Sequence, residues 1–180
     1  MKSGLLSPQG NFSADTWLKI YENELIVAAT SVTISGLDGN SDVLYRLIVR
    51  GVNGYNGSQS IVFQSNGDTG ANYGFQRLMG TNTTVAAVRS ADSYLYITQH
   101  AALNDISFGD VIFYAKSGYV RTCITISAQS ISGTTITDVA TWGQSWNNTT
   151  DNITSLVVKS AASNGLGIGT FIELFKPVPK

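Results

Sequence analysis

The stretch Ser145–Lys176, SWNNTTDNITSLVVKSAASNGLGIGTFIELFK, decides the fold that we predict for this chain. It holds two apolar runs, Ile153–Val158 and Ile168–Phe175, and both are bounded by turn-forming residues. Runs of this length and setting are typical of β-strands. Two strands alone cannot bury their apolar faces, so we expect the rest of the chain to supply a covering sheet.

The linker between these two runs is rich in small residues and ends in Asn164-Gly165-Leu166-Gly167. It is too long for a two-residue hairpin. Gly165, Gly167 and Gly169 indicate bends or bulges at which backbones pass closely.

The rest of the chain contains further short runs with strand character, separated by turn-forming residues. They are Trp17–Tyr21, which fits a strand or one helical turn, Leu25–Ile34, Val43–Val49, Ile61–Gln64, Tyr73–Met79, Thr84–Val88, Tyr94–Thr98, Ile106–Ala115, Tyr119–Ser127 and Thr134–Thr141. Ser117-Gly118 indicates a two-residue hairpin between the eighth and ninth of these runs. Amphipathic helices of ten residues or more and fixed-period repeats are both missing from the pattern.

About eleven or twelve regularly spaced short strands predict an all-β fold, an antiparallel β-sandwich of the jelly-roll-like kind. Residues 17–180 are expected to form this single domain, with residues 1–16 as an N-terminal arm or a frayed terminus. Leu5, Leu6 and Phe12 are the candidate anchors of the arm. The residues predicted to form the core are Ile112, Val120, Ile124, Leu156, Val158, Ile172 and Leu174.

The composition excludes several classes of protein. Charged residues make up 13% of the 180 residues, the formal net charge is −1, and the eleven Lys and Arg residues form no cluster, which argues against nucleic-acid binding. Apolar stretches stay well short of the roughly 18 residues of a membrane helix. The first residues lack the apolar core of a signal peptide, so we expect synthesis in a cytosol.

Groups able to carry catalysis or bind a metal are few. His100 is the only histidine, and although Asp92, Asp105 and Asp110 are near it in sequence, no G-x-S-x-G turn accompanies it. Cys123 is the only cysteine, so the chain can form neither an intramolecular disulfide nor a zinc site built from cysteines. Because Cys123 alternates with polar neighbours, we expect its small side chain to be buried. We therefore expect no enzymatic activity, no cofactor and no metal site.

The acidic turn Asp38-Gly39-Asn40-Ser41-Asp42 starts like a calcium loop. Val43 and Val49 occupy the positions where that loop needs Gly and Glu, so a turn capped by its own side chains explains the pattern. A looser calcium site with Asp68 is the alternative.

Four aromatic residues, Tyr55, Tyr73, Trp142 and Trp146, lie in Gly/Asn-rich loops or at strand ends. Aromatic rings beside amide side chains are typical of sugar-binding faces. The alternative is that these residues close the ends of the sandwich or form a subunit contact.

The C-terminal block also carries a resemblance. The succession W-N-N-T, I-T-S-L with an aliphatic pair, N-G-L-G-I-G and a closing apolar strand resembles the ends of many virion proteins of tailed bacteriophages. Weaker likeness through Gly70-Ala71-Asn72-Tyr73 and Val111–Val120 extends it over about the last two-thirds of the chain. The resemblance implies a compact β-sandwich on a capsid or tail.

The functional hypothesis is a non-enzymatic structural protein of a tailed-phage virion, made in the host cytoplasm. A capsid-decorating or head-surface protein is favoured because the chain lacks a fibre shaft of repeats or heptads. Its expected partners are other virion proteins and copies of itself, with a trimer as the expected oligomer. The alternative is a tail-associated receptor- or carbohydrate-binding module that recognises a host glycan.

Overall fold

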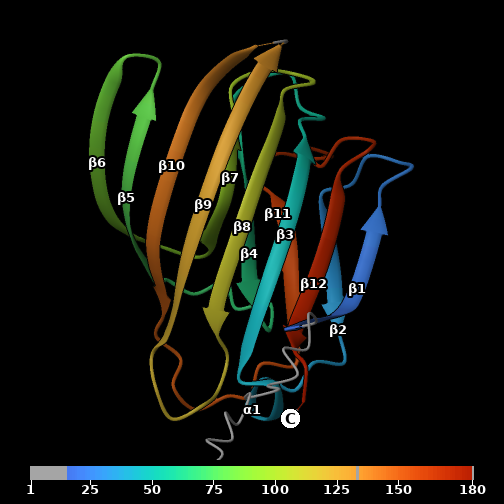
Figure 1. Ribbon diagram of the computed structural model, residues 1–180, viewed down its shortest axis with the longest axis vertical. Helices are drawn as coiled ribbons and strands as arrows, with labels where there is room; N and C mark the ends of the chain where they lie inside the picture. The colour runs from blue at the N-terminus through green and yellow to red at the C-terminus, as the bar shows by residue number, and fades with distance from the viewer. Residues whose placement is uncertain (1–15, 133, 180) are drawn as a thin grey trace, which may run out of the picture.

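The computed structural model describes residues 16–132 and 134–179, and its strands form two antiparallel sheets that face each other (Figure 1). The described elements are β1 (Trp17–Glu24), β2 (Ser31–Ser35), α1 (Gly39–Asp42), β3 (Leu44–Val52), β4 (Gln59–Ser65), β5 (Tyr73–Thr81), β6 (Thr84–Asp92), β7 (Leu95–His100), β8 (Ile106–Tyr114), β9 (Arg121–Ser132), β10 (Thr135–Trp146), β11 (Ser155–Ser160) and β12 (Phe171–Pro177). The all-β sandwich prediction is confirmed, with 62% of the described residues in strands and 2% in helix.

The strand order is that of a jelly roll with two insertions. The larger sheet runs β1-β12-β3-β8-β9-β10-β5-β6 and the smaller runs β2-β11-β4-β7. Without β5, β6, β9 and β10 the two sheets become 1-12-3-8 and 2-11-4-7, the eight-stranded jelly-roll arrangement. The hairpins β5–β6 and β9–β10 therefore extend one sheet from four strands to eight.

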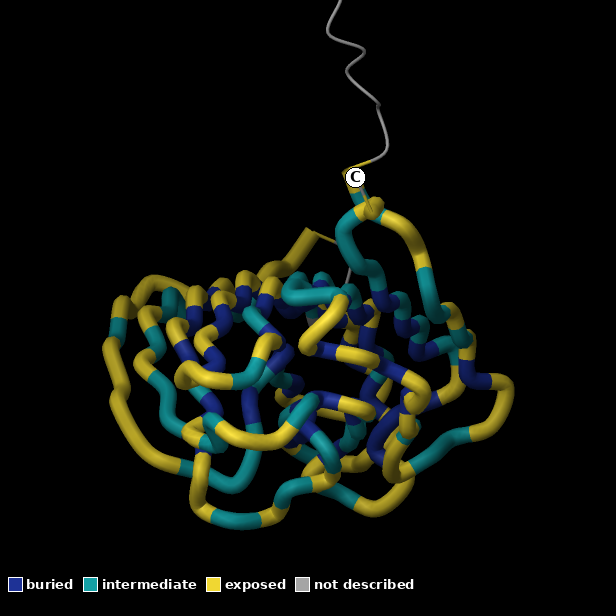
Figure 2. The backbone as a smooth tube through the Cα atoms, turned by 90° about the horizontal axis from the view of Figure 1, so that it is seen from below, coloured by how far each residue is buried: buried dark blue, intermediate teal, exposed yellow. Residues whose placement is uncertain are grey.

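The hydrophobic core lies between the two sheets (Figure 2). Alternate residues of β3, β8 and β12 point into it from the large sheet, and residues of β4, β7 and β11 meet them from the small one. Its fully buried members include Tyr45, Leu47, Val49, Ile61, Phe63, Ile97, Val111, Leu156, Val158, Ile172 and Leu174. Chains of this size can bury roughly 70% of their extended surface, which suits a core of this extent.

The two strands of the C-terminal block lie inside the two sheets, each next to an edge strand. β11 lies between β2 and β4, and β12 lies between β1 and β3. The linker therefore crosses from one sheet to the other, where Leu166 forms bridges to Ala29 and Asn53 and is fully buried. This crossing ties the two sheets together at one end.

The glycines of this linker lie where the sequence indicated close backbone approach. Gly167 N–H donates to the carbonyl of Val52 at 2.8 Å, and Gly165 accepts from Gly54 N–H at 3.0 Å. A Cβ atom at Gly167 would lie 2.9 Å from the Val52 carbonyl oxygen. Gly169 has φ +83°, a left-handed conformation that glycine adopts without strain.

Part of the predicted core is wrong. Ile112, Val120 and Ile124 are 37%, 43% and 52% exposed, whereas the four predicted residues of β11 and β12 are fully buried. The physical reason differs between the two strands: β8 carries large apolar side chains on both faces, and β9 points its isoleucines outward and polar side chains inward, so apolar character did not identify the inward face.

Several local predictions also change in the structure. β8 and β9 pair as a hairpin, but its loop is longer than Ser117-Gly118 because the last pair is Phe113–Cys123. The predicted strand Leu25–Ile34 shortens to β2. The acidic turn forms the single-turn helix α1, capped by the Asp38 side chain on Ser41 N–H at 3.2 Å. The predicted arm anchors Leu5, Leu6 and Phe12 lie outside the described residues.

Candidate interaction surface

The four predicted contact aromatics do not gather on one open face. Tyr73, Trp142 and Trp146 are only 2%, 1% and 1% exposed, while Tyr55 is 43% exposed in the β3–β4 loop. A ring must be accessible to stack on a sugar or meet a subunit. The proposed sugar-binding or subunit-contact role is therefore wrong for the three buried rings, because the inserted hairpins turn them inward.

Trp146 and Tyr73 close the end of the sandwich where β5 begins and β10 ends. The rings stack with centroids 6.2 Å apart, and Trp146 Nε1–H donates to Asp68 Oδ2 at 2.8 Å. Burial raises the pKa of Asp68, but hydrogen bonds from Trp146, Asn72 and the Gly70 amide outweigh it and lower that pKa below its usual value. This carboxylate has a structural role.

Trp142 forms a second aromatic cluster where the large sheet extends past the small one. Its ring stacks on Tyr96 at 4.5 Å, and the Arg77 guanidinium lies 4.7 Å from its centroid. Beside it the Gln144 side-chain amide accepts from Tyr96 N–H at 2.7 Å and donates to Tyr96 C=O at 2.9 Å. Gln144 thus satisfies the free edge of β7 as a neighbouring strand would.

The single histidine takes part in interior packing. His100 Nε2 lies 2.8 Å from Ser107 Oγ, and the two residues are 1% and 2% exposed. Burial lowers the pKa of His100 to about 4, so its imidazole is neutral at physiological pH. Asp105 is held by the Ala101 and Ala102 amides at 2.9 and 2.7 Å. A substrate cannot reach a buried pair of this kind.

Cys123 and the acidic turns likewise have structural roles. Cys123 is buried, as predicted, and burial raises the pKa of its thiol, which keeps it protonated. Asp38 caps α1, and Asp68 binds Trp146. Within residues 16–132 and 134–179, His, Cys, Asp and Glu side chains nowhere come together in a group of three able to hold a metal ion. The same residues include no helix that is long and apolar enough to cross a membrane.

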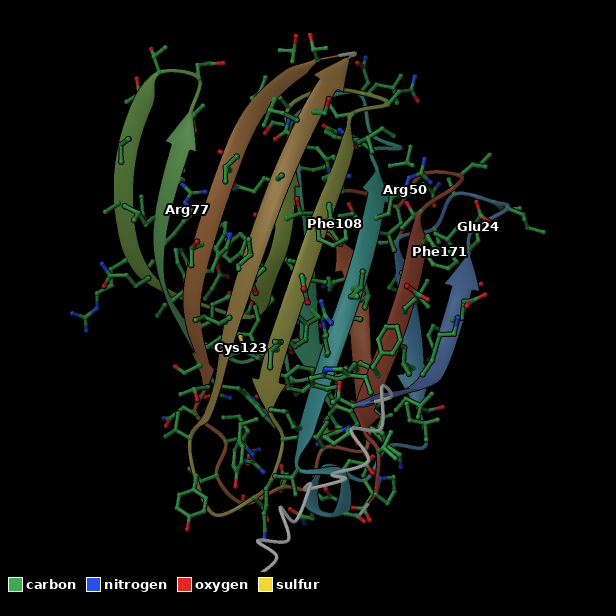
Figure 3. The ribbon with its side chains drawn as sticks, in the orientation of Figure 1. Glu24, Arg50, Arg77, Phe108, Cys123 and Phe171 are labelled. Carbon is green, nitrogen blue, oxygen red and sulfur yellow. The ribbon has the colours of Figure 1, made fainter. Side chains whose placement is uncertain are left out.

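The surface that the sequence did not predict is the outer face of the large sheet, which we define as its side chains pointing away from the small sheet. Burial alternates along β8, where even-numbered residues point outward and odd-numbered ones inward. Cross-strand register extends this assignment to the neighbouring strands. The outer face therefore runs across all eight strands, as Figure 3 shows in front view.

The central and inserted strands make this face apolar. Nine large apolar side chains that are at least 37% exposed point outward from β5, β6, β8, β9 and β10: Leu78, Val85, Ile106, Phe108, Ile112, Ile124, Ile126, Ile136 and Val139. Scattered exposed apolar residues are normal, but a contiguous set of this size marks an interaction site.

Charged residues lie mainly toward the β1 edge of the face. The cross-strand row Glu24, Phe171, Arg50 and Phe108 runs from that edge inward (Figure 3). Among the described outward residues of β8, β9 and β10 only Asp110 is charged, and it accepts hydrogen bonds from Arg46 at 2.9 and 2.6 Å. The centre of the face is therefore electrically neutral.

Two adjoining hollows interrupt the face around Gly143. One, of about 500 Å³, is lined by Leu44, Ile112, Tyr114, Thr122, Cys123, Ile124, Gly143 and Gln144. The other, of about 590 Å³, is lined by Gly74, Phe75, Gln76, Arg89, Ser90, Ala91, Gly143, Gln144 and Ser145. Gly143 has open space where a Cβ atom would stand, so the missing side chain creates part of both hollows.

A signal for this face was present in the sequence. Ile124 and Ile126 alternate with Thr125 and Ser127, which are fully and almost fully buried. A strand whose polar side chains point inward and whose isoleucines point outward is inverted relative to a soluble surface strand.

A scan against family models and searches of curated proteins and of solved structures returned no match for the chain.

Proposed function

We propose that this chain is a non-enzymatic structural protein of a tailed-phage virion, a capsid-decorating protein of the head surface that works by binding other proteins. The observation that carries the proposal is the apolar outer face of the large sheet. An exposed apolar surface of this extent lowers solubility unless a partner covers it. A protein with such a face is suited to assembly.

The topology supports a role in assembly. The main buried cluster draws chiefly on the eight jelly-roll strands, and the inserted hairpins add Tyr73, Cys123 and Trp146 to it. The inserted hairpins β5–β6 and β9–β10 contribute six of the nine outward apolar residues, namely Leu78, Val85, Ile124, Ile126, Ile136 and Val139. The insertions thus supply most of the apolar binding surface.

Two further points support the virion assignment. Jelly rolls are a common architecture of viral capsid domains. The C-terminal block, whose motifs resemble the ends of tailed-phage virion proteins, supplies each sheet with a strand that is paired on both sides. The resemblance therefore involves the part of the chain on which the fold depends.

The experiment is to locate labelled protein on purified phage particles by electron microscopy and to measure its co-sedimentation with particles that lack it. We expect density on the head surface and saturable binding. Ile126→Asp should reduce binding, whereas Val27→Asp, which changes a 70% exposed residue in the β1–β2 loop, should not. Labelled protein that never accompanies particles would contradict the proposal.

The second candidate is a tail-associated module that binds a host glycan. One observation favours it: the exposed ring of Tyr55 borders a cavity of about 370 Å³ whose other lining residues are Ser58, Gln59, Ala161, Ala162 and Ser163. An aromatic ring beside hydroxyl and amide groups suits a sugar. A glycan array with the native protein and Tyr55→Ala tests this: signals lost only in the variant support the module.

A further inference from the structure

We propose that the outer face of the large sheet binds the same face of a second copy, so that the protein forms a twofold-symmetric dimer with its two eight-stranded sheets stacked. The inference rests on the proposed function in taking this face as the assembly surface, and it names the partner. Face-to-face packing of sheets, with about 10 Å between them, is an established way to bury apolar side chains.

The size of the face fits this partner. The six strands from β3 to β6 in the sheet order are nine to twelve residues long. With about 4.8 Å between strands and about 3.3 Å per residue, they cover roughly 29 by 30 Å, or about 860 Å². A stable interface needs about 800 Å² from each partner. One copy therefore offers the area that a dimer requires.

The charges on the face favour a second copy over a charged partner. A twofold interface brings each residue close to its own counterpart, so an unbalanced charge would repel itself. Asp110 is already paired with Arg46, and Lys19 lies 3.3 Å from Glu173 at the β1 edge. The apolar centre carries no other charge on the described residues of β8, β9 and β10. Two copies can meet at this centre without like-charge repulsion, while Arg50 of β3 and Arg89 of β6, which also point outward, lie on the two outermost of the six strands.

The shape of the face is also suited to its own copy. Ile126 and Val139 project from it and are more than half exposed. The hollows at Gly143 lie on the same face and are open. A surface with projections and hollows side by side can pack against itself in one register.

A twofold axis follows from the nine apolar side chains lying on one face; the exposed apolar side chains of Ile26, Val27 and Ile168 lie in loops outside the strands of that face. A closed trimer needs two different complementary surfaces on each copy, whereas a dimer needs one self-complementary surface. The described apolar patch is a single face. The geometry therefore points to a dimer where the sequence alone had suggested a trimer.

The test is the mass of the full chain in solution, measured by light scattering and sedimentation across a range of concentrations. The native protein should have twice the chain mass of 19.2 kDa. Ile124→Asp and Ile126→Asp each place two carboxylates in the interface and should raise the dimer Kd about 100-fold or more. Val27→Asp is the matched control and should leave the dimer unchanged. Ile124→Thr, which keeps the β-branch, replaces the aspartate variant if circular dichroism shows that variant unfolded.

Each outcome decides the inference. A native dimer that both face variants weaken and the control does not would support it. Three results would overturn it: a native protein that is still a monomer at about 100 μM, a native trimer, or a dimer whose Kd neither face variant changes. The test needs no phage particles, so it is separable from the proposed function: a dimer absent from particles refutes the virion role alone, and a monomer that decorates particles refutes the dimer alone.

Discussion

At the scale of single residues, two glycines of the chain differ in how much space surrounds the position of a Cβ atom. Gly167 lies against backbone, with the Val52 carbonyl oxygen 2.9 Å and Gly54 N 3.0 Å from the place of a Cβ atom. Gly143 has nothing within 4 Å of that place. The first glycine is required by the crossing between the sheets, while the second leaves room on the outer face.

The pair predicts opposite results for the same substitution. Gly167→Ala should lower the free energy of unfolding by roughly 1–3 kcal/mol, because backbone atoms cannot move aside as a flexible side chain would. Gly143→Ala should leave it unchanged or raise it by up to about 1 kcal/mol, since alanine reduces the entropy of the unfolded chain. Denaturant unfolding of both variants measures this. Equal losses of unfolding free energy in the two variants would show that the backbone around Gly167 is packed no more closely than that around Gly143.

His100 predicts how stability depends on pH. Burial lowers its pKa to about 4 in the folded protein, against 6.5 as the ordinary value. Between these values the unfolded chain binds a proton that the folded chain does not, so stability is complete above about pH 6.5 and is lost as the pH falls toward 4. The loss attributable to this group is roughly 3 kcal/mol.

Unfolding free energies at pH 7.5 and pH 4.5 test the histidine. His100→Gln keeps a side chain that can bind Ser107 and removes the titration. The variant should lose less stability than the native protein between pH 7.5 and pH 4.5. Protonation of carboxylates accounts for the loss that the two proteins share. Identical pH profiles would mean that His100 is not the group responsible.

At the scale of elements, β9 and β11 show that apolar character alone does not define a core. Leu156 of β11 is fully buried, whereas Ile124 of β9 is 52% exposed. Leu156→Ala should cost roughly 2–5 kcal/mol, as expected for a buried leucine. Ile124→Ala should cost less than about 1 kcal/mol when both variants are measured at concentrations that favour the monomer. A larger loss at Ile124 would place β9 within the core.

Gln144 predicts the energetics of the β7 edge. Its amide pairs with both the N–H and the C=O of Tyr96, which otherwise lie at the free edge of the small sheet. Gln144→Met keeps the length of the side chain and leaves the Tyr96 N–H unpaired, while the Tyr96 C=O keeps the hydrogen bond from the Thr125 hydroxyl at 3.1 Å, so we expect a loss of roughly 1–3 kcal/mol. Gln76→Met, on the exposed outer face of β5, is the control and should be near neutral. Hydrogen exchange at Tyr96 should accelerate only in the first variant.

These elements also show how far the sequence predicted the molecule. The strands, the two-layer sandwich and the close approach at Gly165 and Gly167 followed from local patterns, because turn residues and apolar runs report local geometry. The facing of β8 and β9 did not, since β8 is apolar on both faces, β9 points its polar side chains inward, and register is set by distant partners. Trp142 and Trp146 were misplaced for a related reason: their neighbours in sequence are polar, and their burial comes from β5 and β7, far along the chain.

At the scale of the whole molecule, the two insertions separate folding from binding. The core cluster belongs chiefly to the eight jelly-roll strands, and the outer face belongs mostly to the inserted hairpins. Changes on the outer face should thus alter association more than stability. This separation makes face variants such as Ile126→Asp informative, since their folded state can be verified independently of their binding.

The last prediction concerns residues 2–14, the proposed arm with Leu5, Leu6 and Phe12. The first described strand begins at Trp17 and pairs with β12, so deleting residues 2–14 should leave the sandwich folded. The dimer should persist as well, because the outer face is built from strands of the sandwich. Attachment to particles should weaken, since the deletion removes the apolar side chains of Leu5, Leu6 and Phe12 that we expect to bind a partner surface.

Light scattering of the full-length and truncated proteins, followed by co-sedimentation with purified particles, tests the arm. The expected result is equal solution mass per oligomer and a reduced bound fraction for the truncated chain. Ile126→Asp supplies the complementary control, because it should weaken the dimer and leaves the sequence of the arm unchanged. If the truncated protein co-sediments as fully as the native one, attachment does not depend on residues 2–14, and the contact with the virion must be made by the sandwich, for which the loop carrying the exposed Tyr55 is the next segment to vary.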